Sequence, residues 1–300
     1  MARLTQPETR PLLACEISAD RVIAARSSAK PLRLETFTSR HLAQGVITPG
    51  LSGANVQDPS ALRTAVQGAL AAVGGNSKDI IAIIPDAAVR VLLLDFEGLP
   101  DKQIDRDQVV RFRLKKSLPF DVERAALSYD VQRNNGSLQV VAAVSPASII
   151  EEYESAFRDA GYAPGVLLPS SLASLGMIAA ERPTLALKVD PMNITVAIAQ
   201  SGALRLIRTL DNPAGYDVTA EELAEAVLPS IVFFEDTFGE KIAEILVSGA
   251  AALAAIAPML HQQTGARVQE LAPQTSSEQN LSGEKFPPSL MAGVAGALLG

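Results

Sequence analysis

The sequence of 300 residues has one cysteine, Cys15, no tryptophan and two histidines, His41 and His261. A lone cysteine excludes an internal disulfide framework and fits a reducing compartment. We expect Cys15 to be a small core residue, because it lies in a predicted buried strand. The histidines are far apart and have no cysteines or paired carboxylates near them in the sequence, so no zinc site is predicted.

Long apolar runs and excess positive charge are also missing. The apolar runs at 12–14, 80–84 and 91–94 are far shorter than the roughly 20 residues that a spanning helix needs. The first ten residues lack the apolar core of a signal peptide, and the sequence has no Walker A loop, Gly-x-Ser-x-Gly elbow or Gly-x-Gly-x-x-Gly turn. The net charge of −7 argues against nucleic acid as the main partner. We therefore expect a cytoplasmic protein.

What the sequence does contain is a pattern that occurs twice. Residues 12–17, 22–26 and 32–37 read as strands, followed by a helix that begins at Asp58-Pro59 and a strand at 80–84. The second copy has strands at 185–189, 194–199 and 204–208, a helix with a capping box at Thr219–Glu222, and a strand at 245–248. Two β-β-β-α-β units predict a duplicated α/β architecture with a site between the halves.

An insertion separates the two copies. It reads as a strand at 89–95, a helix at 103–118, two strands at 126–133 and 138–144 joined by an Asn-Asn-Gly-Ser hairpin turn, and a helix ended by Gly161. The helix at 103–118 is strongly basic, with Arg106, Arg111, Arg113, Lys115 and Lys116. That face is either solvated or an electrostatic dock for an acidic partner or anionic lipid headgroups.

The end of this helix carries the most distinctive motif. Pro119 disfavours the α conformation in Leu118, so the helix ends there, and a Phe120-Asp121 turn leads to acidic residues and a strand with Tyr129-Asp130. This "LPFD" stretch, at this place in the insertion, resembles the PilM-type assembly proteins of bacterial type IV pili. That family belongs to the FtsA/PilM branch of the actin-like ATPase superfamily.

The resemblance implies a duplicated RNase-H-like (actin-like ATPase) α/β fold with an inserted SHS2-like, or 1C-like, β-α-β-β-α subdomain. It implies a first half at 1–88, completed by a C-terminal helix at 289–300. The inserted subdomain then spans 89–163, and the second half spans 164–288 with a long loop at 272–288.

In that superfamily, two Asp-x-Gly hairpin loops and a Gly-Gly motif hold ATP and Mg²⁺. In this sequence Glu16 and Ser18 stand at the first Asp and Gly positions, and Ile23 stands where a lysine is common. Lys188 stands at the second Asp position and Asp190 at the Gly position, although another register makes Asp190 the Mg²⁺ ligand. If nucleotide binding is retained, the resemblance implies these contacts: Glu16, Ser18, Ala19, Asp20, Asp190, Asn193, Ser248, Gly249 and Ala250.

Two functions follow from the resemblance. One is a scaffold or adaptor of a type IV pilus inner-membrane platform with a degenerate nucleotide site, no catalytic residues and no cofactor or metal. The other is an ATP- and Mg²⁺-dependent PilM that couples nucleotide state to pilus assembly. A third reading is a GspL-like component of type II secretion.

The implied partner is the N-terminal peptide of a PilN-like single-pass membrane protein, which would hold the chain at the inner face of the bacterial cytoplasmic membrane. PilO-like and PilP-like platform proteins and a pilus motor ATPase are further implied partners. Phe120 either fills the core of the insertion or helps to line a partner groove. The residues expected at that groove are Arg111, Lys115, Leu118, Pro119, Phe120 and Asp121.

Overall fold

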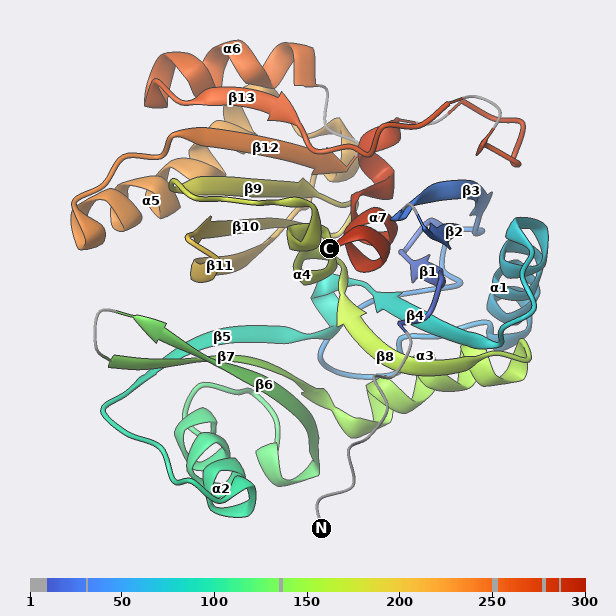
Figure 1. Cartoon of the computed structure of the whole chain (residues 1–300), viewed down its shortest axis with the longest axis horizontal. Helices are drawn as coiled ribbons and strands as arrows, with labels where there is room; N and C mark the ends of the chain where they lie inside the picture. Colours follow the sequence, from blue (N-terminus) through green and yellow to red (C-terminus); the bar gives the residue numbers. More distant parts are fainter. Residues whose placement is uncertain (1–9, 31, 135–136, 250–252, 277–278, 286) are drawn as a thin grey trace.

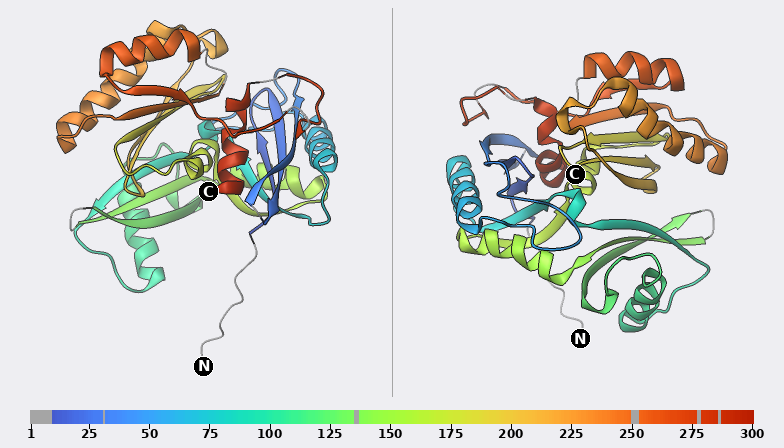
Figure 2. Two further views of the ribbon diagram at one scale, coloured as in Figure 1. Left: turned by 45° about the horizontal axis from the view of Figure 1, so that its top comes forward. Right: turned by 180° about the vertical axis from the view of Figure 1, so that it is seen from behind.

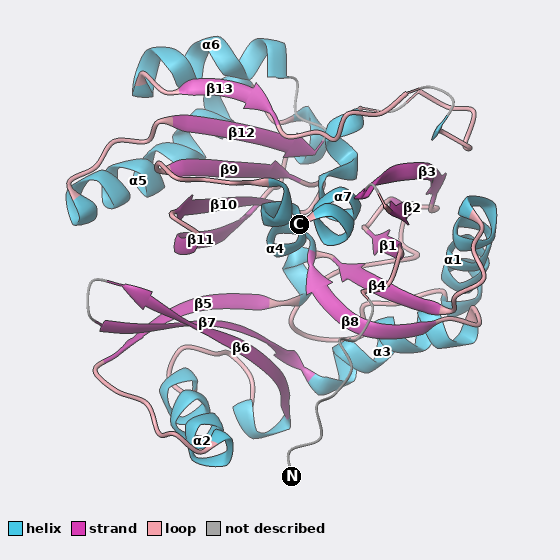
Figure 3. Ribbon diagram, viewed as in Figure 1, coloured by secondary structure: helices cyan, strands magenta, loops and turns pink. Residues whose placement is uncertain are grey.

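The computed structural model describes the chain except residues 1–9, 31, 135–136, 250–252, 277–278 and 286. Three sheets, each with helices on at least one face, make up the molecule (Figures 1 and 3). The first has the order β3-β2-β1-β4-β8, in which β1 pairs antiparallel with β2 and parallel with β4. Its strands are β1 (Leu13–Ile17), β2 (Arg21–Ala29), β3 (Leu32–His41), β4 (Asp79–Ile84) and β8 (Ala163–Pro169).

Alternation along β1 divides the first half into two cores. Leu13, Cys15 and Ile17 face helices α1 (Pro59–Val73) and α3 (Ala147–Asp159), whereas Ala14 faces helix α7 (Ala292–Leu299). Glu16 shares the α7 face of the strand because successive side chains point to opposite faces. Helix α1 begins as expected, since Oδ1 of Asp58 accepts from the N–H groups of Ser60 and Ala61 at 3.0 and 2.9 Å.

The second sheet repeats this arrangement with the order β11-β10-β9-β12-β13. Helices α5 (Ala220–Phe238) and α6 (Leu253–Thr264) pack on one face, and α5 starts with the expected capping box of Thr219 and Glu222. Helix α6 and strand β13 extend the repeat beyond the predicted elements. The strands are β9 (Thr184–Val189), β10 (Asn193–Gln200), β11 (Ala203–Asp211), β12 (Glu244–Gly249) and β13 (Arg267–Glu270).

The insertion forms a third sheet, β5-β7-β6, made of β5 (Arg90–Phe96), β7 (Ser137–Pro146) and β6 (Ala125–Asn134). On one face Leu94, Val140 and Ala142 pack against helix α2 (Gln103–Leu114). On the other face Leu93 and Val141 pack against the second sheet. Helix α2 ends at Leu114, four residues before the predicted end, and its turn continues as far as residue 117.

Two elements that follow the inserted sheet, α3 and β8, pack with the first half of the chain. Helix α3 contributes Ile149, Tyr153 and Phe157 to the core of the first half, and β8, which was not predicted, is the edge strand of the first sheet. After β8, the chain forms the short α4 (Ser170–Ser174) and a 3-10 turn at Leu175–Met177. The proposed boundaries at 88, 163 and 288 remain predictions. None of the helices in the described ranges is both long and apolar enough to cross a membrane.

Candidate functional site

Two hairpin turns, one from each half, line a common cavity. In the turn between β1 and β2, the N–H of Ser18 donates to the carbonyl of Arg21 at 2.9 Å. Asp20 accepts from the hydroxyl of Ser18 at 2.9 Å and from Nη2 of Arg21 at 2.7 Å. In the turn between β9 and β10, the N–H of Asp190 donates to the carbonyl of Asn193 at 2.9 Å. Both turns are therefore closed by their own hydrogen bonds.

The ammonium group of Lys188, from β9, lies at the centre of the site. It forms ion pairs with Oε1 of Glu16 at 4.0 Å and with Oδ2 of Asp86 at 3.9 Å, and a closer one with Asp190. Lys188 is 6% exposed and Glu16 is 4% exposed. Because Glu16 and Asp86 belong to the first half and Lys188 to the second, these ion pairs join the two halves.

Hydrogen bonds from α4 and β10 hold the two carboxylates of the first half. The hydroxyl of Ser170 donates to Oε1 of Glu16. Oδ1 of Asp86 accepts from the N–H and the hydroxyl of Ser171 at 2.9 and 2.8 Å, and Oδ2 accepts from the hydroxyl of Thr195 at 3.3 Å. Oε2 of Glu16 has no hydrogen-bond partner among the described residues.

Helix α7 closes the site on the side of Oε2. A Cβ at Gly293 would lie 2.2 Å from Oε2 of Glu16, so only glycine allows the helix backbone to come this close. The carboxylate oxygen that lacks a partner is therefore packed against backbone and shielded from water.

Burial and charge shift the pKa values in this cluster. Burial raises the pKa of Glu16 to about 7, against the positive charge of Lys188 and the hydrogen bond from Ser170, which lower it. Burial also raises the pKa of Asp86. In Lys188 burial lowers the pKa of the ammonium, but the charges of Asp190, Asp86 and Glu16 outweigh burial and hold it above its ordinary value. Lys188 is therefore a fixed positive charge at neutral pH.

At the edge of the cluster, partial burial raises the pKa of Asp20, but the hydrogen bonds and the charge of Arg21 outweigh it. The pKa of Asp20 is therefore held below its ordinary value. The carboxylate of Asp20 therefore interacts with Arg21 and with the hydroxyl of Ser18 in its own turn.

The residues present do not fit Mg²⁺ and ATP. Carboxylates bind Mg²⁺ through oxygen, but here the ammonium of Lys188 already lies among the three carboxylates and would repel a divalent cation. The cavity between the two turns has a volume of about 10 Å³, and so does the adjoining cavity beside Tyr216 and Gly249. Each holds roughly one water molecule, so neither takes a nucleotide in this arrangement.

The other predicted nucleotide contacts have structural partners. Ala19 and Asn193 line the cavity, and Nδ2 of Asn193 donates to the hydroxyl of Thr195 at 3.2 Å. Gly249 has a φ of +92°, and a Cβ there would lie 2.0 Å from the carbonyl oxygen of Val189. Its own carbonyl accepts from the hydroxyl of Ser289 at 2.8 Å.

Gly249 thus allows β12 and β9 to approach closely. Ser248 next to it is buried. Ala250, the third residue of that predicted motif, lies outside the described residues.

Sequence reasoning did not find Asp86, Ser170, Ser171 or Gly293. Asp86 follows Pro85, the first residue after β4, and the two serines directly follow Pro169 at the end of β8. Polar residues at the ends of neighbouring parallel strands are the signal that could have found them, because such ends meet at one edge of a sheet.

The residues predicted for a partner groove divide into two groups. Three of them make contacts within the insertion. Nη1 of Arg111 donates to the carbonyls of Val122 and Ala125 at 2.5 and 3.2 Å. Leu118 packs on the core between α2 and the third sheet, and Asp121 accepts from the N–H of Glu123 at 3.0 Å. Of the remaining three, Lys115 and Pro119 are exposed, as Asp121 is, and Phe120 is half-buried.

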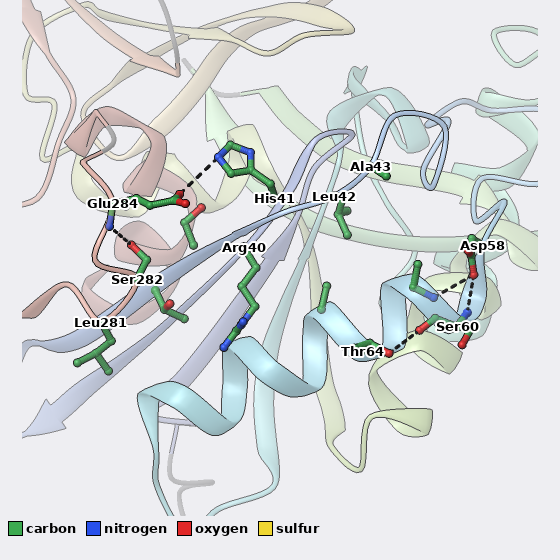
Figure 4. A pocket seen from close by; sticks show the side chains of 14 residues that line it. Arg40, His41, Leu42, Ala43, Asp58, Ser60, Thr64, Leu281, Ser282 and Glu284 are labelled. Carbon is green, nitrogen blue, oxygen red and sulfur yellow. Dashed lines mark hydrogen bonds and ion pairs between the residues drawn. The ribbon is translucent and has the colours of Figure 1, made fainter.

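A much larger hollow lies elsewhere. Figure 4 shows it between β3, the start of α1 and the loop at 281–284, with a volume of about 750 Å³. Across it Nε2 of His41 lies 3.6 Å from Oε2 of Glu284. None of the predicted site residues lines this hollow, so size alone does not identify a functional site here.

No protein-family model and no curated protein matches the sequence. Solved structures do match. The structure described as "PilM-PilN type IV pilus biogenesis complex" is similar with a TM-score of 0.77 at 18% identity, covering 97% of this chain and 98% of that chain. The cytoplasmic domain of EpsL, an inner membrane component of the type II secretion system of Vibrio cholerae, matches with a TM-score of 0.55 at 12% identity, covering 96% and 94%.

A third similar structure is a Bacteroides thetaiotaomicron protein with an actin-like ATPase fold and unknown function. It has a TM-score of 0.50 at 11% identity, with 85% of this chain and 89% of that chain covered. The predicted fold class is thus confirmed. The chain has the actin-like ATPase fold in the form found in PilM.

Proposed function

We propose that the chain is a PilM-like scaffold of a type IV pilus assembly platform, which binds the N-terminal peptide of a PilN-like membrane protein and has lost the use of ATP. The observation that carries this proposal is the match to PilM over nearly the whole length of both chains. A component of that kind works in the cytoplasm at the inner face of the bacterial membrane. PilO-like and PilP-like proteins and a motor ATPase would be reached through the same platform.

The cluster around Lys188 supports the scaffold role. In a nucleotide-dependent protein of this fold, a ligand between the halves brings them together. Here the ammonium of Lys188 and the carboxylates of Glu16 and Asp86 make the connection without a ligand. A connection built into the chain favours a permanently closed arrangement over a cycle of binding and release.

We place the peptide at the accessible side of the "LPFD" turn, with Lys115, Pro119 and Phe120 in contact with it. An extended peptide is held by backbone hydrogen bonds and by pockets for its side chains. The half-buried ring of Phe120 offers an apolar wall, and Arg111, Leu118 and Asp121 keep the turn rigid beneath it.

Titration of the purified chain with Mg·ATP in a calorimeter tests the loss of nucleotide use. We expect no saturable heat at millimolar ATP, because the ammonium of Lys188 already pairs with the carboxylates that Mg²⁺ would need. Saturable binding that disappears in Glu16→Ala or Asp190→Ala would overturn this part of the proposal and support an ATP-dependent PilM.

Titration with a synthetic peptide tests the partner. The probe is the cytoplasmic N-terminal segment of a PilN-like protein with an Asn-Leu-Leu-Pro-like core, and a scrambled peptide is the control. We expect Phe120→Ala to weaken binding about tenfold or more, which corresponds to about 1.4 kcal/mol. Phe233→Ala is the matched control, since Phe233 is an exposed phenylalanine on α5. Absence of binding to the wild-type chain would overturn the partner assignment.

The likeness to EpsL favours a second candidate, a component of a type II secretion platform. The lower TM-score of that match makes it the weaker of the two. A titration with both peptides separates the two candidates. A type II component should bind the corresponding peptide of its own secretion platform more tightly than the PilN-like peptide.

A further inference from the structure

The outer face of α2 exposes large apolar side chains that no other element covers in the described part of the chain. The side chain of Phe112 is 76% exposed and that of Ile104 is 72% exposed, while Val109 is partly exposed on the same helix. Val110 and Leu114 supply the buried face of the helix. At about 100° per residue, Phe112 lies near the middle of the outward side, with Ile104 and Val109 on either side of it.

Cations surround Phe112. Arg113, Lys115 and Lys116 are exposed, and no acidic residue occurs between 111 and 116. The other two arginines of this helix bind backbone carbonyls of the insertion. Arg106 donates to the carbonyls of Pro100 and Asp101 at 3.1 Å each, and Arg111 donates to the carbonyl of Val122. Asp105, in the first turn, lies beside Ile104 and about 10 Å along the helix from Phe112, so the positive charge is concentrated at the C-terminal end of α2. This local excess of positive charge contrasts with the net charge of −7 of the whole chain.

The position of α2 leaves this face accessible. The helix packs on one face of the three-stranded sheet, and the second sheet packs on the other face. In Figure 1 and both views of Figure 2, α2 lies at the periphery of the molecule. A broad, flat surface can therefore approach it without meeting the two large sheets.

We propose that α2 is a contact surface for an anionic membrane. Phe112, with Ile104 and Val109, enters the headgroup region of the bilayer, and Arg113, Lys115 and Lys116 bind lipid phosphates. Lipid fits better than an acidic protein because Phe112 and Ile104 are mostly exposed on a convex helix, which suits a flat headgroup layer better than an extended peptide. The basic side chains at the C-terminal end of α2 also complement the negative surface of anionic bilayers. This inference goes beyond the proposed function, since it needs neither the peptide nor the platform.

Co-sedimentation of the full chain with vesicles tests the proposal. We expect binding to phosphatidylcholine vesicles that contain phosphatidylglycerol, little binding to phosphatidylcholine alone, and a bound fraction that falls as salt is raised. Phe112→Ser and the double variant Lys115→Glu/Lys116→Glu should each reduce the bound fraction severalfold.

Matched controls distinguish binding through α2 from non-specific association with vesicles. Phe233→Ser changes an exposed phenylalanine on α5, and Arg33→Glu/Arg63→Glu reverses two exposed charges on the first half. Both should bind like the wild type, and far-ultraviolet circular dichroism checks that every variant is folded. Absence of binding to anionic vesicles, or equal loss in the controls and the α2 variants, would overturn the proposal. Because no peptide is present, either result is independent of the peptide titration.

Discussion

The ammonium nitrogen of Lys188 lies 4.0 Å from Oε1 of Glu16, and the two residues belong to different sheets. Asp86, also from the first half, lies 3.9 Å from the same nitrogen. A single lysine thus neutralises carboxylates of the opposite half of the molecule. Buried charges of this kind are stable only while each keeps its counter-charge.

Removal of the Lys188 charge should destabilise the chain strongly. In Lys188→Met the apolar stem is kept, but the buried carboxylates of Glu16 and Asp86 lose their counter-charge. The loss of a partner from a buried ion pair costs about 3–5 kcal/mol. We expect a drop of this size in the free energy of unfolding, measured by urea denaturation at pH 8, above the pKa of about 7 of Glu16.

Lys241→Met is the control for this variant, because the exposed Lys241 makes a surface ion pair with Glu235 at 3.7 Å. Surface pairs contribute about 0–1 kcal/mol. Equal effects of the two substitutions would show that Lys188 does not hold the halves together.

The raised pKa of Glu16 predicts that stability depends on pH. Its pKa is about 7 in the folded chain and 4.5 as the ordinary value, so between these pH values the folded chain holds a proton that the unfolded chain has released. The free energy of unfolding should therefore fall as pH rises from about 4.5 to 7, by about 3 kcal/mol in total.

Glu16→Gln should flatten this pH dependence, because glutamine does not titrate. Some slope should remain, since the pKa of Asp86 is raised as well. Melting temperatures measured from pH 4.5 to 8 give the comparison, and Glu225→Gln on the exposed side of α5 is the control. A slope in Glu16→Gln as steep as in the wild type would contradict this assignment.

Local signals predicted much of the fold. The Asp58 cap, the Thr219–Glu222 capping box and both β-β-β-α-β units follow from residues close in the sequence, and the structure has them. These features are visible in sequence because caps and hairpins form between near neighbours.

Long-range contacts account for what was missed. Strand β8 contains Pro164 and Gly165, which disfavour a strand locally, and it pairs with β4 through tertiary packing. Asp86 joins the site through Ser171, which is 85 residues away. No local pattern reports such a contact, and the only sequence signal for Asp86 is its place just after the end of β4, next to the end of the parallel strand β8.

Gly293→Ala should destabilise the contact between α7 and the first sheet. The added Cβ would lie 2.2 Å from Oε2 of Glu16, and the hydrogen bond from Ser170 limits the room for that carboxylate to move. Overpacking of this kind costs about 1–3 kcal/mol. Thermal unfolding measures the loss, and Gly98→Ala, where a Cβ meets nothing within 4 Å, is the control. An unchanged melting temperature in Gly293→Ala would mean that α7 can move away from Glu16 at little cost.

Gln132 makes a specific link between the inserted module and the second half. Its Nε2 donates to the carbonyl of Leu204 at 2.5 Å, and its Oε1 accepts from the N–H of Leu204 at 3.0 Å. In Gln132→Ala the N–H and the carbonyl of Leu204 would bind water instead of the glutamine side chain. If these hydrogen bonds stabilise the amide by about 1.4 kcal/mol, it should exchange its hydrogen about tenfold faster in the variant.

Hydrogen-exchange mass spectrometry of peptides that contain Leu204 measures this effect. Gln269→Ala on β13 is the matched control, because Gln269 pairs with Glu244 at 3.0 Å within the second sheet and does not contact the insertion. If exchange at Leu204 is the same in Gln132→Ala as in the wild type, the apolar contacts of Leu93 and Val141 are sufficient to hold the module in place. Faster exchange confined to the Gln132 variant would show that the backbone pair fixes the position of the inserted sheet against β11.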